Sequence, residues 1–422
     1  MKIEQIYTGC LSQGAYFISS EGEAAVIDPL RETKPYLDRA EKEKLKIKYV
    51  FETHFHADFV SGHVDLASKT GASIVFGPGA DTGFSIHQGK DNEEFWVGKI
   101  KIRLLHTPGH TQESSSFLLF DEKGKEYCIF TGDTLFIGDV GRPDLTVSTN
   151  LTQDDLAGML YDSLRNKIMN LPPHIIVYPA HGAGSACGKN LSKDTFDTLE
   201  NQLKVNYALQ SISKEEFIRE VTTGILPPPK YFPKNAALNK SGYSSYDQVV
   251  ERGNIPLNPE DFERLANETG ALILDVRNNE AFSSSHIPNS IFIGLDGQFA
   301  PWVGALIPDL QHAILLVTPE GREEETIMRL SRVGYDNSIG FLNGGIQAWK
   351  DSGRETSSLD AISADELKNK IEKESVKVLD VRKPGEHDAQ HLSGAENKPL
   401  DYINDWTINL NKNQTYFVHC AG

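Results

Sequence analysis

Four short segments that carry histidine and aspartate constrain the fold of the first 210 residues, because each follows a run that reads as a β-strand. Their side chains of interest are His54, His56, Asp58, His110, Asp133 and His181. The preceding runs are rich in β-branched and aromatic residues, a pattern typical of strands. Residues at strand ends are exposed on a rigid base. Because neutral imidazole and carboxylate groups are metal ligands, the pattern predicts that these side chains converge on one metal ion.

These four segments, in this order, resemble those of the metallo-β-lactamase superfamily over roughly residues 1–210. The resemblance implies an αββα sandwich for this part of the chain. The usual first motif of the superfamily is H-x-H-x-D-H, and here Phe59 replaces the last histidine. Members with two zinc ions, such as glyoxalase II, use that histidine to hold the second metal, and phenylalanine has no lone pair to offer. A site for one metal therefore remains, formed by His54, His110 and Asp133.

Two histidines and one carboxylate with open positions are the ligand set typical of non-haem Fe(II) oxygenases. The set resembles that of the persulfide dioxygenase branch of the superfamily, in which the equivalent residues bind iron. The resemblance implies one Fe(2+) per chain. His56, Asp58 and His181 are then expected to orient the ligands or to hydrogen-bond bound water and oxygen. For each of them, membership of a buried polar network is the alternative.

Two further residues are candidates for contact with the substrate. Arg142 lies in a loop that resembles the family's loop with an arginine that contacts the thiol substrate, and its planar guanidinium suits a carboxylate. A surface ion pair with Asp144 or Asp139 is the alternative. Cys187 follows a glycine-rich run after His181, as in bacterial dioxygenases fused to rhodanese modules. It is a candidate catalytic residue that accepts or positions a sulfane sulfur, or else a buried small side chain.

The second half of the chain contains an internal repeat. Residues 272–277 recur as residues 377–382, and His286 recurs as His391, with an offset of 105 positions in both cases. Each unit opens with an apolar strand that ends in Asp-Val-Arg and continues into a helical pattern, which predicts a parallel α/β sheet. The segment that precedes the repeat, residues 224–258, contains three consecutive prolines and is predicted to be an extended connector.

Both repeat units resemble the rhodanese fold. Active rhodaneses place a cysteine after a central strand, in a loop whose backbone N–H groups stabilise the thiolate. In the first unit Thr318 stands at this place, and we expect that unit to be catalytically silent. In the second unit Cys420 is in register for the nucleophile. Only Ala421 and Gly422 follow it, so we expect an incomplete second domain in which most of the cradle is missing.

Composition narrows the partners. The chain has 42 basic and 59 acidic residues, a net charge of −17, which argues against nucleic acid as the main partner. No apolar run approaches the ~18 residues of a membrane span, and no signal peptide is recognised. The four cysteines are widely spaced, so no disulfide framework is predicted, and a cytoplasmic location fits best.

The sequence as a whole predicts a multidomain protein of α/β and α+β class. The expected divisions are a metal-binding domain at 1–223, a connector at 224–258, and rhodanese-like domains at 259–355 and 356–422. The resemblance implies oxidation of a low-molecular-weight thiol persulfide by O2 to sulfite, coupled to sulfurtransferase chemistry that gives thiosulfate, in a homo-oligomer. Two alternatives stay open: a zinc-dependent thiolester hydrolase that resembles glyoxalase II, and a non-catalytic sulfur-carrier scaffold.

Overall fold

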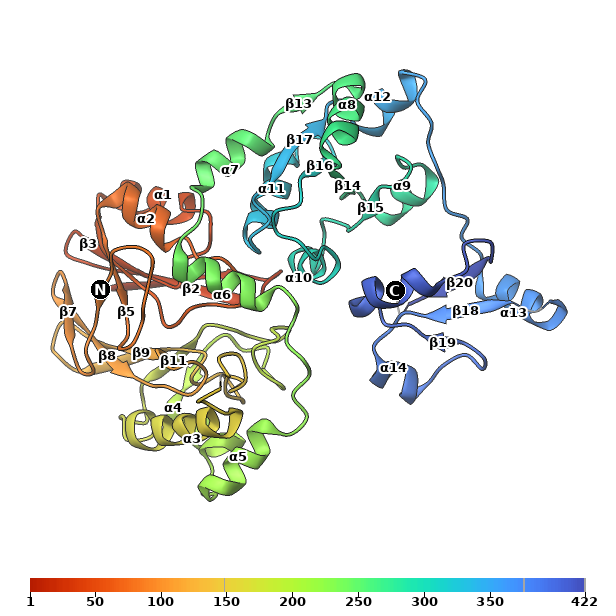
Figure 1. Cartoon of the computed structure of the whole chain (residues 1–422). Helices are drawn as coiled ribbons and strands as arrows, with labels where there is room; N and C mark the ends of the chain where they lie inside the picture. Colours follow the sequence, from red (N-terminus) through yellow and green to blue (C-terminus); the bar gives the residue numbers. More distant parts are fainter. Residues whose placement is uncertain (148, 375, 421–422) are drawn as a thin grey trace. The chain divides into compact units, whose positions relative to one another are not determined.

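The computed structural model describes residues 1–147, 149–374 and 376–420. The chain divides into two compact units (Figure 1). Unit 1 comprises Met1–Asn254 together with Glu324–Ser338, and unit 2 comprises the other residues from Ile255 onward. The proposed metal site lies entirely in unit 1.

Two six-stranded sheets form the framework of unit 1. The first sheet has the order β1 (Lys2–Thr8), β2 (Gln13–Ser20), β3 (Glu23–Ile27), β4 (Lys46–Phe51), β5 (Ser73–Phe76), β6 (His87–Gln88). The second sheet has the order β12 (Asp197–Thr198), β11 (Ile176–Pro179), β10 (Glu126–Gly132), β9 (Ser115–Phe120), β8 (Ile100–His106), β7 (Glu94–Val97). Strands β1 to β3 are antiparallel and β3 to β6 parallel, whereas in the second sheet only the β10–β11 pair is parallel.

The two sheets share one apolar core. Alternate residues of the first sheet, such as Tyr16 and Ile27, lie in the same buried cluster as Ile102 and Phe117 of the second sheet. This arrangement follows from the period of two along a strand, which turns every second side chain to one face. The outer faces bear separate apolar clusters that pack against helices. The predicted αββα sandwich is therefore confirmed (Figure 1).

Helices α1 (Lys34–Glu43) and α2 (His63–Thr70) pack on the outer face of the first sheet, and α3 (Gln153–Ser163), α4 (Leu199–Val205) and α5 (Lys214–Thr222) on that of the second. Unit 1 also contains α6 (Phe232–Ser241) and α7 (Tyr246–Gly253). The last two correct the sequence prediction, because the segment expected to be extended forms helices over most of its length. Pro233 lies in the first turn of α6. Proline is tolerated there, since the first N–H groups of a helix have no partner within the helix.

Unit 2 contains two parallel sheets, as the repeat predicts. The larger has the order β13 (Pro256–Leu257), β17 (Ser338–Leu342), β16 (Ile314–Val317), β14 (Leu272–Asp275), β15 (Ile291–Phe292). The smaller has the order β19 (Glu396–Asn397), β18 (Lys377–Asp380), β20 (Tyr416–His419). The helices are α8 (Pro259–Thr269), α9 (Asn279–Ser284), α10 (Phe299–Leu306), α12 (Gly345–Asp351), α13 (Ala364–Lys373), α14 (Pro384–Ala389) and α15 (Ile403–Trp406). Helix α11 (Glu323–Ser331) starts at the unit boundary and belongs mostly to unit 1.

The repeated Asp-Val-Arg motif has a structural role in both sheets. Arg277 donates to Asp275 and to the carbonyl of Ser285. Arg382 makes the same two contacts, with Asp380 and with the carbonyl of Gln390. The arginine thus ties the end of the first strand to the turn after the following helix, which explains why the motif recurs.

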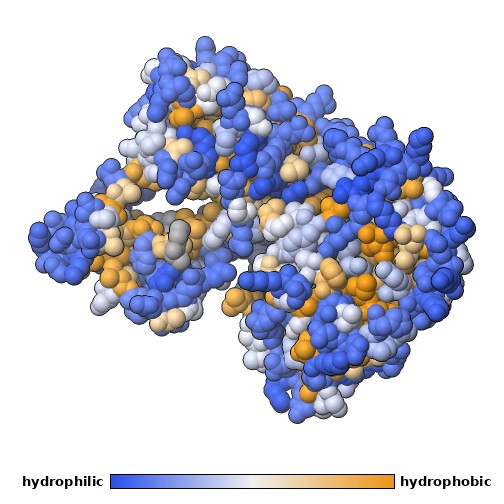
Figure 2. Space-filling model, turned by 180° about the vertical axis from the view of Figure 1, so that it is seen from behind, coloured by the Kyte–Doolittle hydropathy of each residue, from blue (hydrophilic) through white to orange (hydrophobic). Residues whose placement is uncertain are grey.

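The surface of the protein is largely polar. Hydrophilic residues cover most of the face shown in Figure 2, and apolar side chains gather there in smaller patches between them. Within the part of the chain that the structure describes, none of the helices is both long enough and apolar enough to cross a membrane.

Candidate metal centre

The structure brings together the three side chains expected to bind the metal. His54, His110 and Asp133 are buried, and their donor atoms all lie within 4.8 Å of one another. Asp133 Oδ2 is 3.3 Å from Nε2 of His110 and 3.8 Å from Nε2 of His54. The three residues follow β4, β8 and β10, so the ends of three strands hold the cluster.

Hydrogen bonds fix the tautomer of both histidines. The Thr53 hydroxyl donates to Asp28 Oδ2 at 2.9 Å, so its oxygen accepts from Nδ1 of His54 at 3.0 Å. Nδ1 of His110 donates to the carbonyl oxygen of Arg142 at 2.8 Å. In each ring the lone pair is therefore on Nε2, the nitrogen that faces Asp133.

The electrostatics of the cluster match the needs of a cation. Both oxygens of Asp133 and Nε2 of His54 are buried without a hydrogen-bond partner among the described residues. Burial of such groups is costly unless a partner compensates. Burial, followed by the neighbouring histidines, holds the pKa of His54 well below its usual value, so this ring stays neutral as a metal ligand must. The donor set fits one metal ion.

The remaining three motif residues form a second group beside the first. The donor atoms of His56, Asp58 and His181 also lie within 4.8 Å of one another. Nε2 of His181 is 3.5 Å from Asp58 Oδ2 and 3.5 Å from Asp133 Oδ1. The two oxygens of Asp133 thus face different groups. The structure therefore brings all six motif residues together, in two adjoining sets.

His56 also belongs to a network behind the cluster. Its Nε2 lies 3.1 Å from Asp28 Oδ1 and 3.5 Å from Glu52 Oε2. Burial opposes the charge on this ring, but the carboxylates of Asp28 and Glu52 outweigh it and raise the pKa of His56 to about 9. Asp28 in turn bonds Thr53, which orients His54. His56 is therefore linked to the cluster through its ion pair with Asp28 and the hydrogen bonds of Thr53.

Known proteins that resemble this chain fall into two families. Residues 8–181 match the model of the metallo-beta-lactamase superfamily, and residues 258–352 and 363–422 match that of the rhodanese-like domain. The human mitochondrial persulfide dioxygenase ETHE1 is 31% identical over 210 residues, which cover 49% of this chain and 74% of that protein. The chain belongs to the metallo-β-lactamase superfamily.

Other relatives in this superfamily are named for a different activity. A probable hydroxyacylglutathione hydrolase of Schizosaccharomyces pombe is 29% identical over 181 residues, which cover 42% of this chain and 66% of that protein. A solved structure described as a metallo-beta-lactamase from Staphylococcus aureus has a TM-score of 0.70 at 32% identity, and covers 81% of this chain and 98% of its own. The predicted order, a lactamase-type domain followed by rhodanese-like domains, is confirmed.

The lactamase-type domain carries Phe59 where its superfamily motif has a histidine. This side chain is fully buried, and its ring packs on that of His56 with the centroids 4.4 Å apart. An aromatic ring in this place supplies no donor to the group of His56, Asp58 and His181. The second group thus lacks the residue that completes a two-metal site in the hydrolases of the superfamily.

The guanidinium of Arg142 is occupied by the protein itself. Its Nε and Nη2 donate to the two oxygens of Asp144 at 2.6 and 2.7 Å, and Nη2 also donates to the carbonyl of Leu226 at 2.6 Å. This is the ion pair considered as the alternative. A substrate carboxylate would have to displace Asp144, so the clamp stays a prediction. The observed link of Arg142 to the cluster is its carbonyl, which holds His110.

Cys187 lies at the cluster. Its thiol is 1% exposed and within 4.8 Å of the donor atoms of Asp133 and His181. Burial raises the pKa of the Cys187 thiol well above its usual value, and the charges of Asp58 and Asp133 raise it further. The thiol is therefore protonated at neutral pH in the absence of a cation. Its role with sulfane sulfur stays a prediction.

Two residues of the connector at the site were missed by sequence analysis. Asn239 on α6 hydrogen-bonds the loop of the first motif. Tyr231 is buried just before α6, and burial raises the pKa of its phenol, with further contributions from the charges of Asp58 and Cys187. A segment expected to be extended gave no signal that it would reach the site.

The rhodanese-like domains differ at the position of the nucleophile. Thr318 follows β16 and Cys420 follows β20, and these strands pair in the same register with β14 and β18. The Thr318 hydroxyl and the backbone N–H of Gly321 both donate to Glu323 Oε1, at 3.2 Å. A carboxylate of the chain thus occupies a loop that would otherwise stabilise a thiolate. Cys420 is exposed, and Ala421 and Gly422 lie outside the described residues.

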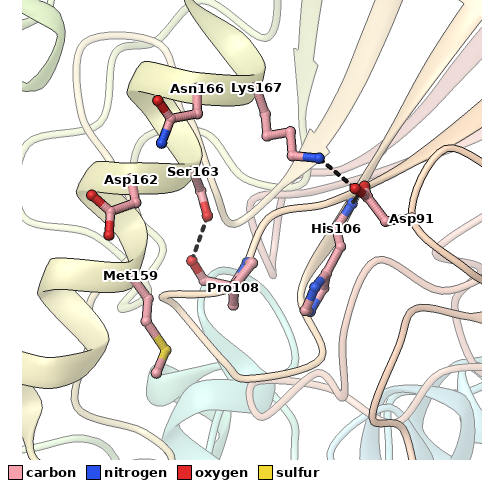
Figure 3. Close-up of a pocket in the computed structure, with 8 residues that line it drawn as sticks. All are labelled: Asp91, His106, Pro108, Met159, Asp162, Ser163, Asn166 and Lys167. Atoms are coloured by element: carbon pink, nitrogen blue, oxygen red, sulfur yellow. Dashed lines mark hydrogen bonds and ion pairs between the residues drawn. The ribbon is translucent and has the colours of Figure 1, made fainter.

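A surface pocket lies behind the loop that carries His110 (Figure 3). Its lining residues are Asp91, His106, Pro108, Met159, Asp162, Ser163, Asn166 and Lys167. Ser163 donates to the carbonyl of Pro108 at 2.7 Å, and Lys167 pairs with Asp91 at 2.5 Å. None of the six motif residues lines this pocket. Its contacts support the loop that leads from β8 to His110.

Proposed function

We propose that this protein is a persulfide dioxygenase with one iron bound by His54, His110 and Asp133. The observation that carries the proposal is the buried cluster of two Nε2 atoms and one unpartnered carboxylate, the ligand set of non-haem iron oxygenases. The similarity to persulfide dioxygenase ETHE1 over half of the chain supports it. The balanced reaction is R–S–SH + O2 + H2O → R–SH + SO3²⁻ + 2 H⁺.

In this reaction the outer sulfur of the persulfide loses four electrons and O2 gains them. Fe(2+) held by the cluster would supply the redox chemistry for this transfer of electrons from the persulfide to O2. The protein's own residues orient the two histidine ligands, because Thr53 holds the ring of His54 and the Arg142 carbonyl holds the ring of His110. Burial of the cluster excludes bulk water, which strengthens every electrostatic interaction inside it.

Oxygen uptake across a panel of thiol persulfides tests the proposal. Iron-loaded protein is offered the persulfides of glutathione, coenzyme A and cysteine, with the corresponding thiols as controls. We expect O2 consumption with at least one persulfide and none with the thiols. The thiol that carries the persulfide stays open, because one relative is named for hydroxyacylglutathione and another only for a persulfide. Failure of every persulfide, together with hydrolysis of a thiolester, would favour the hydrolase.

The zinc-dependent thiolester hydrolase remains the alternative, and one observation favours it. The group of His56, Asp58 and His181 adjoins the first cluster, and several relatives are named hydroxyacylglutathione hydrolases. Phe59 weighs against it, since the second group lacks a histidine. A non-catalytic sulfur-carrier role fits only the rhodanese-like half, where Thr318 replaces the nucleophile.

Metal content separates the dioxygenase from the hydrolase. We expect purified, iron-supplemented protein to hold one iron per chain, because Phe59 supplies no donor to the second group and the raised pKa of His56 opposes its use as a neutral ligand. Elemental analysis by mass spectrometry gives the stoichiometry. The His110→Ala variant is expected to lose most of this iron, whereas the surface variant His87→Ala is expected to retain it. Two zinc ions per chain in the active protein would contradict the assignment.

Sulfur transfer is expected to depend on Cys420. We propose that the Cys420 thiolate attacks the outer sulfur of a second R–S–SH and releases R–SH. Sulfite then attacks the outer sulfur of the Cys420 persulfide, which gives thiosulfate and regenerates the Cys420 thiol. The Cys420→Ser variant is expected to consume O2 at the wild-type rate but to release sulfite in place of thiosulfate. Cys10→Ser is the control. Equal yields of thiosulfate from wild type and Cys420→Ser would refute the transfer step while leaving the dioxygenase untouched.

A further inference from the structure

The loop that carries the first metal motif needs partners from outside the loop. Residues 52–62 join β4 to α2 and contain no helix and no extended strand. All of these residues except Phe55 are buried, and buried backbone polar groups are almost always paired. The first half of the loop is held by neighbours in the lactamase-type domain: Thr53 N–H donates to Asp28 at 2.8 Å, and Phe55 N–H donates to Glu113 at 3.0 Å.

The second half of the loop is held by Asn239. Its side-chain Nδ2 donates to the carbonyl of His56 at 2.7 Å and to the carbonyl of Phe59 at 2.8 Å. Its Oδ1 accepts from the backbone N–H of Ser61 at 2.9 Å. One side chain on α6, about 180 positions away in sequence, thus pairs three backbone groups of the loop. Asp58 lies between these two residues in the sequence.

Only a carboxamide can make this set of contacts. Two donors and an acceptor at one side-chain end are found in asparagine and glutamine alone. Asn239 is 1% exposed, so removal of its amide leaves two buried carbonyls and one N–H without partners. Each unpaired buried group destabilises this arrangement, and a loop without secondary structure can relieve that cost by moving. The loop would then lose the backbone geometry that places His56 and Asp58.

A continuous route connects this contact to the metal cluster. The backbone of His56 is fixed by Asn239, and its ring lies 3.1 Å from Asp28. Asp28 accepts from both the N–H and the hydroxyl of Thr53, and that hydroxyl accepts from Nδ1 of His54. A shift of His56 therefore changes the support of Asp28, which in turn orients the imidazole that faces Asp133.

Neighbouring contacts of α6 strengthen the same attachment. The hydroxyl of Tyr243 donates to the carbonyl of Ser61 and accepts from the N–H of Val64 at 3.2 Å. The carbonyl of Lys240 accepts from the N–H of Gly83 at 2.9 Å. The chain directly after Asn239 is thus held to the domain at two points, which keeps the carboxamide in place.

We propose that Asn239 is a positioning residue of the metal site: its carboxamide locks the second half of the motif loop and, through His56, Asp28 and Thr53, the orientation of His54. The proposal rests on the metal-binding role of the cluster in the proposed function. It assigns to the connector a part in the site itself, in addition to joining two domains.

The test compares Asn239→Ala with Asn235→Ala in the full chain. Asn235 lies one turn earlier on α6, is fully buried, and has a side-chain amide with no hydrogen-bond partner among the described residues. Its replacement therefore removes a similar volume but no hydrogen bond to the loop. Titration with Co²⁺, followed by visible absorption, reports affinity and ligand geometry. We expect Asn239→Ala to bind Co²⁺ about tenfold more weakly, as for other groups that orient metal ligands, and Asn235→Ala to stay within about twofold of wild type.

A second variant guards against a folding defect. Asn239→Asp keeps the volume but has no donor for the carbonyls of His56 and Phe59, and circular dichroism of the metal-free proteins establishes that each variant is folded. Weaker Co²⁺ binding with an altered absorption spectrum in a folded Asn239 variant supports the proposal, even if the protein oxidises no persulfide. Affinity and spectrum equal to those of Asn235→Ala in the folded Asn239 variant would overturn it, even if the dioxygenase is established.

Discussion

Replacement of Asp133 with alanine is expected to abolish oxygen consumption, a loss of at least about 1,000-fold, or roughly 4 kcal/mol of activation free energy. Asp133 is the only carboxylate of the first cluster, and its two oxygens face both groups of histidines. Without it the cluster keeps two neutral imidazoles, which cannot balance the charge of a divalent cation. The rate of O2 uptake with a saturating persulfide is the measurement, and iron content is read on the same sample.

The matched control for this loss is Thr318→Ala. Thr318 stands where an active rhodanese has its nucleophile, and its hydroxyl only donates to Glu323. We expect this variant to retain wild-type oxygen uptake within about twofold. A fall of tenfold or more in the Thr318 variant would show that the first rhodanese-like domain takes part in the reaction. If Asp133→Ala retains both its iron and its oxygen uptake, the cluster is not the metal site of the reaction.

Arg332→Met is expected to destabilise the protein by about 3–5 kcal/mol, because it leaves a buried carboxylate without its partner. Arg332 and Glu32 are both nearly inaccessible, and the guanidinium binds both oxygens of Glu32, with Nε 3.1 Å from Oε2. The carbonyl of Arg332 also accepts from the N–H of Val60 in the motif loop at 2.7 Å. The free energy of unfolding of each variant is measured by denaturant titration.

An exposed ion pair provides the comparison for Arg332. Arg264 pairs with Glu268 on α8, and both side chains are more than half exposed, so Arg264→Met is expected to change stability by less than about 1 kcal/mol. The double variant Glu32→Gln/Arg332→Met removes both charges and should recover a large part of the loss. If Arg332→Met lowers the free energy of unfolding no more than Arg264→Met does, the buried pair does not stabilise unit 1.

The members of the metal cluster could be predicted from sequence because they lie at strand ends. The order of strand and motif fixes which edge of the fold each side chain occupies, so His54, His110, Asp133 and the other three converge without any knowledge of packing. The repeat of the second half could also be predicted from the sequence, because Arg277 and Arg382 make local contacts with the strands they follow. Short-range patterns of this kind specify their own geometry.

Long-range contacts could not be predicted in the same way. Asn239, Arg332 and Tyr231 reach the motif loop or the cluster from segments far along the chain, and their residue types are ordinary for a helix or loop surface. Prolines favour an extended connector in the sequence, yet Pro233 lies in the first turn of α6. The state of Arg142 also depends on tertiary structure, because Asp144 and the carbonyl of Leu226 take its donors.

The stoichiometry of O2 and sulfite in the Cys420→Ser variant tests the central claim most directly, because this variant is expected to stop at sulfite. Iron-loaded protein is given a limiting amount of the best persulfide, O2 uptake is recorded to completion, and sulfite and free thiol are then quantified. The account predicts one sulfite and one thiol for each O2 consumed, with no turnover in the zinc-loaded protein. Sulfite formation without O2 uptake, or turnover that zinc supports as well as iron, would contradict it.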